Sequence, residues 1–460
     1  MTMQHDSTSF LQQMDNHFVH PWEDLTALGA NKRTMIAQAS GVYITDTDGH
    51  RMIDGPGGMW CVNAGYGREE IIDAIAEQLR QLSYFSPWSA SASPAAKLAE
   101  RLAALAPGDL NHVFFTTCGS TAVDSALRFI FFYNNCLGRP EKKHVISRIG
   151  AYHGSTYLAA ACSGKMSEKQ NMDMADERVH LLPPPNPRLR PAGTSITDFC
   201  DRKVKDLEDK ILELGPDRVA AFIAEPILAS GGVIIPPAGY HKKCWEVCRK
   251  HDVLYISDEV VTAFGRLGHH FASEDVFGVV PDIITTAKGL TSGYVPMGAV
   301  LISDRLIRET VRSSNGPRNF FNGFTYSGHP VAAAAALANL DIMEREDLLG
   351  HVRAVSGHFS ERLKALEALP VVAEVRVDGL MAGVECELDP ERPDEARDYA
   401  FALEVDKLCQ DLGLMVRPVY NTCVMSPPLI INESEIDEMA RILRNGIEQA
   451  TADARTEAEA

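Results

Sequence analysis

The sequence predicts an α/β protein with two domains: a large domain with a mostly parallel β-sheet flanked by helices, and a smaller α+β domain. The length of 460 residues exceeds the size at which one hydrophobic core stops growing. Between about residues 112 and 304, short apolar runs alternate with amphipathic segments, which is typical of a sheet covered on both faces. The pattern changes on both flanks of this region, which indicates a second unit.

Six apolar runs in the central region predict the strands. Each run is apolar almost throughout, as expected for parallel strands that are buried on both faces. The runs are HVFFTTC, HVISRIG, VAAFIAEP, VLYISDEV, DIITTAK and MGAVLISD. Ligands of such sheets bind at the carboxyl ends of the strands. The polar residues that end or follow these runs are therefore candidates for the functional site: Ser120, Glu225, Asp258 and Lys288.

The flanks predict the domain boundaries. GVYITDTDGHRMID reads as two antiparallel strands around an Asp-Gly turn. After residue 330, HPVAAAAALANLDIMERED predicts a helix, and the strands VAEVRV and MAGVECEL follow. We expect an N-terminal segment at 1–60 that packs with the small domain, a large domain at 61–333 and a small domain at 334–460.

Composition excludes several classes of function. The net charge of −18 disfavours nucleic acid, which is bound mainly through Lys and Arg. Cys244 and Cys248 lie four residues apart, but no His or Cys pair follows at zinc-site spacing, so no metal site is expected. The N-terminus lacks the pattern of a signal peptide, and no apolar stretch approaches about 20 residues. We expect a cytoplasmic protein with no membrane contact.

Lys288 is the first candidate for chemistry. It follows the buried run DIITTA, and burial disfavours a charged amine and so favours its nucleophilic neutral form. A lysine that ends a strand is more often simply solvated, but Asp258 strengthens the case. It ends the preceding run, and the separation 288 − 258 = 30 residues fits one strand–helix–strand unit. Both groups are therefore expected at one edge of the sheet. The simpler alternative is that Asp258 and Glu259 form an ordinary acidic pair on the surface.

A Gly-Ser-Thr turn in TTCGSTAVDSALRF begins a predicted helix. Exposed N–H groups and the helix dipole at such a turn suit a phosphate, although an ordinary capped helix explains the pattern as well.

Taken together, the motifs resemble one family. CGSTAVDSA, AYHGST, AFIAEPI, SDEVVTAFGR, TTAKGLTSGYVPMGA and FTYSGHP occur in this order. From about residue 35 to 450 the chain resembles the class III aminotransferases, in the omega-aminotransferase (amine:pyruvate) branch of the pyridoxal-phosphate enzymes of fold type I. The resemblance implies pyridoxal 5'-phosphate as cofactor and a homodimer or dimer of dimers.

The resemblance also implies roles for individual residues. Lys288 would carry the cofactor covalently and move the proton, and Asp258 would pair with the pyridine nitrogen. Val260 and Tyr152 would cover the two ring faces. The remaining cofactor contacts would come from Gly119 and Ser120 at the phosphate, Glu225 near the ring substituents, and Thr325 at the phosphate of the neighbouring subunit. Many relatives carry Glu where this chain has Thr121 and Asp124, which affects helix packing and substrate detail.

The substrate pocket rests on three further residues. An exposed arginine and core tryptophans are the ordinary readings of Arg417, Trp60 and Trp88. The resemblance implies instead that Arg417 is a mobile arginine that grips the carboxylate of a keto acid such as pyruvate and swings away for an uncharged amine. Trp60, Trp88 and Tyr152 would form an aromatic wall that disfavours glutamate.

The expected activity is a ping-pong transfer of an amino group from a primary amine or omega-amino acid to a keto acid. Two alternatives remain open: an aminomutase or decarboxylase on the same scaffold, and a non-catalytic regulator that binds pyridoxal phosphate. A nicotinamide oxidoreductase is disfavoured because no G-x-G-x-x-G opens a helix after the first strand.

Overall fold

The computed structural model describes residues 8–30, 33–313, 315–316 and 318–459. Residues 1–7, 31–32, 314, 317 and 460 lie outside the described residues. The first of these ranges belongs to the N-terminal stretch for which we expect no signal peptide. None of the described helices has the length and apolar character needed to cross a membrane.

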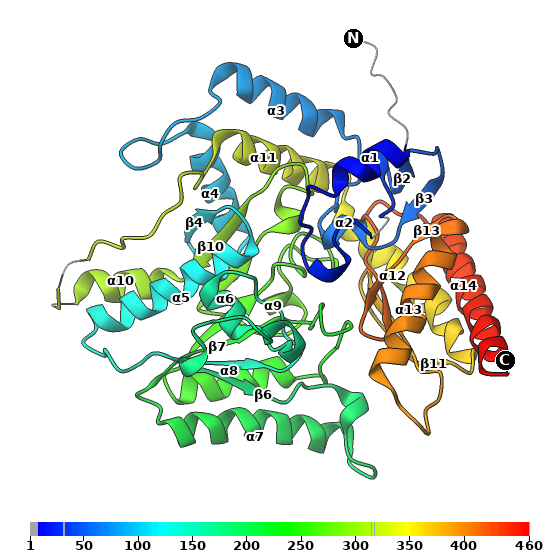
Figure 1. The fold of residues 1–460 in the computed structure, drawn as a ribbon. Helices are drawn as coiled ribbons and strands as arrows, with labels where there is room; N and C mark the ends of the chain where they lie inside the picture. Colours follow the sequence, from blue (N-terminus) through cyan, green and yellow to red (C-terminus); the bar gives the residue numbers. More distant parts are fainter. Residues whose placement is uncertain (1–7, 31–32, 314, 317, 460) are drawn as a thin grey trace.

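A large central sheet organises the fold (Figure 1). In the described part of the chain it has seven strands in the order β4-β10-β9-β8-β7-β5-β6. The strands are β4 (His112–Thr116), β5 (His144–Arg148), β6 (Val179–Leu182), β7 (Val219–Ala224), β8 (Leu254–Asp258), β9 (Ile283–Thr286) and β10 (Gly298–Ile302). The neighbouring pairs from β9 through β8, β7 and β5 to β6 are parallel. The predicted α/β class with a mostly parallel sheet is confirmed.

β10 differs from the prediction, because it runs antiparallel to both β4 and β9. Its residues are all buried, and an apolar run buried on both faces has the same sequence pattern in either direction. β6 was not among the predicted strands, and it extends the sheet next to β5.

Two smaller sheets lie beside the large one. The predicted N-terminal hairpin is confirmed by β2 (Tyr43–Asp46) and β3 (Arg51–Asp54), which pair antiparallel around the Asp48-Gly49 turn. β1 (Ile36–Ser40) joins β2, and β3 pairs with β13 (Leu414–Met415) from the C-terminal region. The other sheet has the order β11 (Val372–Asp378), β12 (Met381–Cys386), β15 (Thr422–Met425) and β14 (Arg417–Val419). N-terminal and C-terminal strands therefore share one unit of structure.

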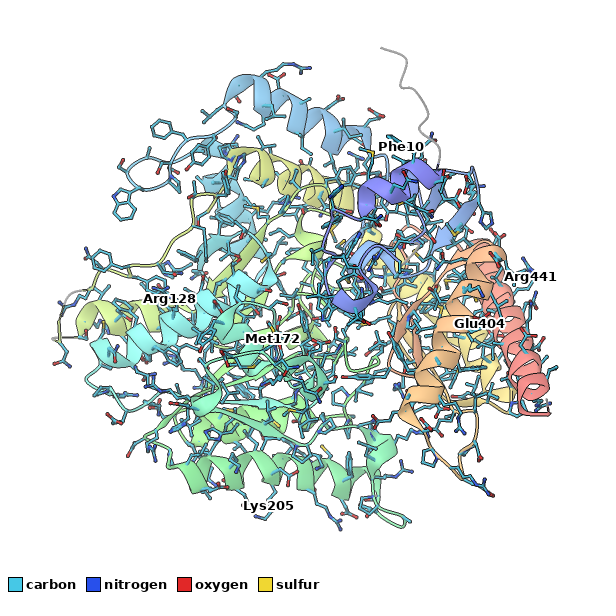
Figure 2. All side chains as sticks on the ribbon, viewed as in Figure 1. Phe10, Arg128, Met172, Lys205, Glu404 and Arg441 are labelled. Atoms are coloured by element: carbon cyan, nitrogen blue, oxygen red, sulfur yellow. The ribbon has the colours of Figure 1, made fainter. Side chains whose placement is uncertain are left out.

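Amphipathic helices cover the sheets. The described helices are α1 (Thr8–Asp15), α2 (Gly57–Trp60), α3 (Glu69–Gln81), α4 (Ser93–Leu105), α5 (Gly119–Cys136), α6 (Tyr157–Cys162), α7 (Ile196–Leu214), α8 (Tyr240–Lys250), α9 (Ala272–Asp275), α10 (Asp304–Arg312), α11 (Pro330–Arg345), α12 (Leu348–Lys364), α13 (Glu395–Asp411) and α14 (Glu433–Glu459). Their polar faces point outward, as Lys205 on α7, Glu404 on α13 and Arg441 on α14 illustrate (Figure 2). Cys244 and Cys248 on α8 are buried in an apolar core.

Arg266 joins segments that lie far apart in the sequence. Its side chain is fully buried, and its Nη1 donates to the carbonyls of Leu380 at 3.0 Å and Pro427 at 2.7 Å. Its Nη2 donates to Asn63 Oδ1 at 3.1 Å. Burial lowers the pKa of the guanidinium to about 10, so the hydrogen bonds must offset a large desolvation cost.

Arg266→Ala should lower the free energy of unfolding by about 3 kcal/mol, because it leaves three buried acceptors unpaired. Urea denaturation followed by circular dichroism measures the loss. Arg308→Ala is the matched control, since Arg308 forms an exposed ion pair with Asp304 and such pairs contribute at most about 1 kcal/mol. Equal effects of the two substitutions would contradict this role of Arg266.

Candidate active site

Lys288 lies immediately beyond β9, at the carboxyl edge of the large sheet. Its backbone has a φ of 41°, which is a strained conformation for a side chain other than glycine. Burial lowers the pKa of the amine, and the charge of Asp258 acts in the opposite direction. The site therefore holds an amine that is shifted toward its neutral form and faces an acid.

Asp258 ends β8, which is the parallel neighbour of β9. The buried carboxylate accepts hydrogen bonds from Thr285 Oγ1 at 3.1 Å and from the backbone N–H of Val260 at 3.2 Å. Its other oxygen is paired with His153 Nδ1 at 2.6 Å. The separation of one strand–helix–strand unit thus brings Lys288 and Asp258 to the same edge, as the sequence predicts.

His153 is a site residue that the sequence reasoning missed. Its ring is buried, and its Nε2 has no hydrogen-bond partner among the described residues. The backbone N–H donates to Ser163 Oγ at 2.9 Å, which fixes the segment. The AYHG motif contained the signal, because its His directly follows Tyr152. The pairing with His153 orients the carboxylate of Asp258.

The start of α5 forms a turn with open backbone N–H groups. Ser120 Oγ accepts from the backbone N–H of Ser155 at 3.1 Å, which ties the turn to the segment after Tyr152. A Cβ at Gly119 would lie 2.9 Å from Val260 Cγ1, so glycine permits the turn to approach Val260. An anion fits this arrangement because the helix dipole and the N–H groups point in the same direction.

Thr121 and Asp124 lie in the first turns of α5. Thr121 Oγ1 accepts from the backbone N–H of Cys118 at 3.0 Å, and Asp124 accepts from the N–H of Ala159 at 2.8 Å. Both side chains accept hydrogen bonds from backbone N–H groups near the start of the helix, so their role is structural.

Glu225 follows β7 and is almost fully buried. It accepts from the backbone N–H of Tyr152 at 2.9 Å and of Ala229 at 3.1 Å. Burial raises the pKa of its carboxyl group. The carboxylate therefore fixes the backbone of Tyr152, whose own hydroxyl lies 2.9 Å from Ser155 Oγ.

Trp60 brings the two basic groups of the site together. The guanidinium carbon of Arg417 lies 5.0 Å from the centre of its ring, and Lys288 Nζ lies 5.4 Å from it. Trp60 is buried although its φ is 58°. Asp54 stabilises this bend by accepting from the backbone N–H of Gly58 and from the Tyr66 hydroxyl, both at 2.7 Å.

Trp22 is a second residue that the sequence reasoning missed. Its ring centre lies 5.8 Å from that of Tyr152, and its side chain is exposed. The N-terminal segment therefore reaches the aromatic side of the site. Only the tryptophan itself marked this position in the sequence.

Trp88 and Thr325 do not join the other residues within one chain. Trp88 is 88% exposed on the loop between α3 and α4, and Thr325 is also exposed. The Tyr84 hydroxyl donates to the carbonyl of Thr325 at 2.8 Å, so the two loops lie side by side. Together they present exposed aromatic residues: Phe85, Trp88, Phe321 and Tyr326.

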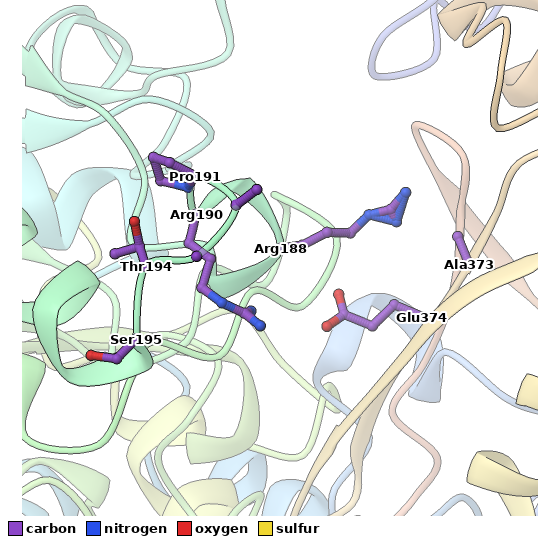
Figure 3. Close-up of a pocket in the computed structure, with 9 residues that line it drawn as sticks. Arg188, Arg190, Pro191, Thr194, Ser195, Ala373 and Glu374 are labelled. Atoms are coloured by element: carbon purple, nitrogen blue, oxygen red, sulfur yellow. The ribbon is translucent and has the colours of Figure 1, made fainter.

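A separate surface cleft of about 870 Å³ lies between β11 and the segment before α7 (Figure 3). Arg188, Arg190 and Glu374 line it. None of the predicted site residues does, and Arg188 is already paired with Glu385 and Glu387. Within the described residues, no cluster of His, Cys, Asp or Glu could hold a metal ion.

Comparison with known proteins gives a consistent result. Residues 27–447 match the family model described as Aminotransferase class-III. The chain is 39% identical over 439 residues to the putrescine–pyruvate aminotransferase of Pseudomonas aeruginosa, covering 95% of each protein. It is 38% identical over 413 residues to a mitochondrial gamma-aminobutyrate transaminase 1 of Oryza sativa subsp. japonica, covering 89% of this chain and 80% of the relative.

Solved structures with the same fold are also transaminases. A thermostable (S)-enantioselective omega-transaminase from Thermomicrobium roseum is similar with a TM-score of 0.91 and 36% identity, covering 97% of this chain and 98% of the other. The omega-transaminase of Pseudomonas jessenii in complex with PMP has a TM-score of 0.93 and 34% identity, covering 96% and 98%.

Asp258→Asn should lower the pKa of Lys288 further, because it removes the nearby negative charge that favours the ammonium form. The amine should then react with an acylating reagent at a lower pH than in the unchanged protein. Mass-spectrometric labelling of Lys288 across pH, in protein freed of small ligands, measures this shift. Asp275→Asn, at an exposed position, controls for net charge. If the pKa of Lys288 were unchanged or higher in Asp258→Asn, the two groups would not interact as described.

Proposed function

The chain belongs to the class III aminotransferases, and we propose that it transfers an amino group from a primary amine or omega-amino acid to a keto acid, with pyruvate as acceptor. The main support is that Lys288 and Arg417 lie over the ring of Trp60. In addition, burial lowers the pKa of the Lys288 amine and the charge of Asp258 acts on it. Ping-pong transfer follows from the need to bind the two substrates in turn at one base.

The residues present fit pyridoxal 5'-phosphate, the cofactor on which class III aminotransferases depend. The N–H groups at Gly119 and Ser120 would hold the phosphate, and Val260 and Tyr152 would cover the two ring faces. The contact that a Cβ at Gly119 would make with Val260 supports this pairing of turn and ring face. Asp258 would face the ring nitrogen, and Glu225 would position the ring substituents. When bound, the cofactor supplies a carbonyl for the amino group and a ring that withdraws electrons.

Lys288 performs the proton transfer. Its Nζ, whose pKa is lowered by burial, removes the proton from the carbon that bears the amino group and later returns it as a general acid. Thr285, the backbone N–H of Val260 and His153 hold the carboxylate of Asp258 in place. The buried ring of Trp60, whose centre lies 5.4 Å from Lys288 Nζ, would help to exclude water from the lysine.

The pocket selects substrates by charge and shape. Arg417 would bind the carboxylate of the keto acid through two parallel hydrogen bonds and move aside for an amine that has no carboxylate. Trp60, Tyr152 and Trp88 would form an aromatic wall that favours apolar donors and makes glutamate a poor one. The names of the relatives support this class: one acts on putrescine with pyruvate and another on gamma-aminobutyrate.

We propose a homodimer, or a dimer of dimers, in which Thr325 serves the neighbouring active site. The exposed loops that carry Trp88 and Thr325 support this assembly, since together they form an aromatic surface. The proposed parts are the segment 1–60, the large domain 61–333 and the small domain 334–460. The pairing of β3 with β13 supports the placement of the N-terminal segment, and α11 crosses the boundary at 333. We propose a cytoplasmic location.

Lys288→Ala should lower alanine formation from pyruvate and a primary amine by at least about 10³-fold, because it removes the general base. Binding of pyridoxal phosphate should persist through the phosphate turn and Asp258. Chromatographic assay of L-alanine measures the rate, and Lys205→Ala at an exposed ion pair of α7 serves as the control. Turnover by Lys288→Ala within about tenfold of the unchanged enzyme would refute the assignment.

Thr325→Val should raise the dissociation constant of pyridoxal phosphate about tenfold, the effect of losing one hydrogen bond to a charged group. Equilibrium dialysis measures it, and Thr325→Ser, which keeps the hydroxyl, should restore affinity. Sedimentation should give at least twice the mass of one chain. A monomer that binds the cofactor equally well with either substitution would contradict the shared site.

A further inference from the structure

Arg417 is a partly buried cation that has no ion pair with any side chain in the described part of the chain. Its guanidinium contacts Met59 Sδ and lies over Trp60. Burial lowers the pKa of the group. A charge that is partly removed from water and has no ion pair is less favourable than a paired one, so an anion beside the guanidinium would stabilise it. The substrate carboxylate is one such anion, and it is absent whenever the donor is a simple amine.

Glu168 is a second anion, near enough for its charge to act on Arg417. It lies in the short 3₁₀ turn Met166–Lys169, and its side chain is 29% exposed. Glu168 Oε1 is 2.9 Å from Lys165 Nζ, and that amine lies 5.3 Å from the ring of Tyr420. Tyr420 follows Arg417 by three residues. Lys165 therefore connects Glu168 to the segment that carries the arginine.

The charge of Glu168 reaches the residues of the pocket. Burial is the main cause of the raised pKa of Tyr152, and the charge of Glu168 acts in the same direction. Burial lowers the pKa of Arg417, and Tyr152 and Glu168 partly oppose that effect. Tyr399 acts on Arg417 in the same direction. Glu395 is a further acid nearby. It lies at the exposed start of α13, and its charge acts on Tyr420. Among these groups Glu168 is the acid that acts on Arg417 itself.

We propose that Glu168 is a positioning residue that receives the guanidinium of Arg417 when the arginine leaves the pocket for a donor without a carboxylate. The inference rests on the proposed function. Lys165 competes for the same carboxylate, so the three side chains form a switch with two arrangements. In one, Glu168 pairs with Lys165 and Arg417 holds a substrate carboxylate. In the other, Arg417 pairs with Glu168 and the pocket accepts an apolar group.

The switch makes a prediction about a ratio of substrates. L-alanine needs Arg417 inside the pocket, and 1-phenylethylamine needs it outside. The ratio of kcat/KM for L-alanine to that for 1-phenylethylamine therefore follows the equilibrium between the two arrangements, whichever of them predominates. A loss of stability or of cofactor binding lowers both constants and leaves the ratio unchanged.

Glu168→Gln should raise this ratio about threefold to fivefold, the effect of losing one partly exposed ion pair. Lys165→Met should lower the ratio, because Glu168 then becomes available to Arg417. Both donors are measured with the holoenzyme and pyridoxal phosphate in excess, in the half-reaction with the amine alone. Glu395→Gln makes the same change of charge nearby and should leave the ratio unchanged.

A double-mutant cycle identifies the partner. In an Arg417→Ala background, Glu168→Gln should no longer change the ratio. An unchanged or lowered ratio in Glu168→Gln, or an equal change with and without Arg417, would overturn the inference. If the unchanged enzyme converts neither amine, the proposed function itself fails and the inference with it. Turnover of both amines with an unchanged ratio removes the inference alone.

Discussion

The interaction between the amine of Lys288 and the carboxylate of Asp258 is the constraint on which the site depends. Burial lowers the pKa of Lys288, and the charge of Asp258 opposes that larger effect. The balance requires a fixed carboxylate, which Thr285, the N–H of Val260 and His153 provide. Adjacent parallel strands bring the two groups to one edge without a special loop.

Much of this arrangement can be predicted from sequence, because it follows from regular structure. Apolar runs predict the strands, and the residue after each run lies at the ligand edge of a parallel sheet. The direction of β10 cannot be predicted in this way, because burial on both faces removes the pattern that would distinguish it. The role of His153 depends on a contact between residues 105 positions apart. Trp88 and Thr325 are exposed, and their predicted roles need a second chain.

The site also contains the features that are least favourable to stability. Lys288 and Trp60 have left-handed backbone conformations, and Arg417 is partly buried without an ion pair in the described residues. Such strain persists only where the surroundings determine it, and here Asp54 stabilises the bend at Trp60. The lack of an ion pair at Arg417 has a functional explanation, since its guanidinium can pair with a substrate carboxylate or, as we propose, with Glu168. The cost in stability therefore coincides with the ability to accept two kinds of substrate.

The most direct test of the account is to locate the covalent bond to the cofactor. Pyridoxal phosphate is added to the protein, the bond is reduced with sodium borohydride, and the peptides are mapped by mass spectrometry. The account predicts that the label resides on the peptide containing Lys288. A label on another lysine, or no label at all, would contradict it.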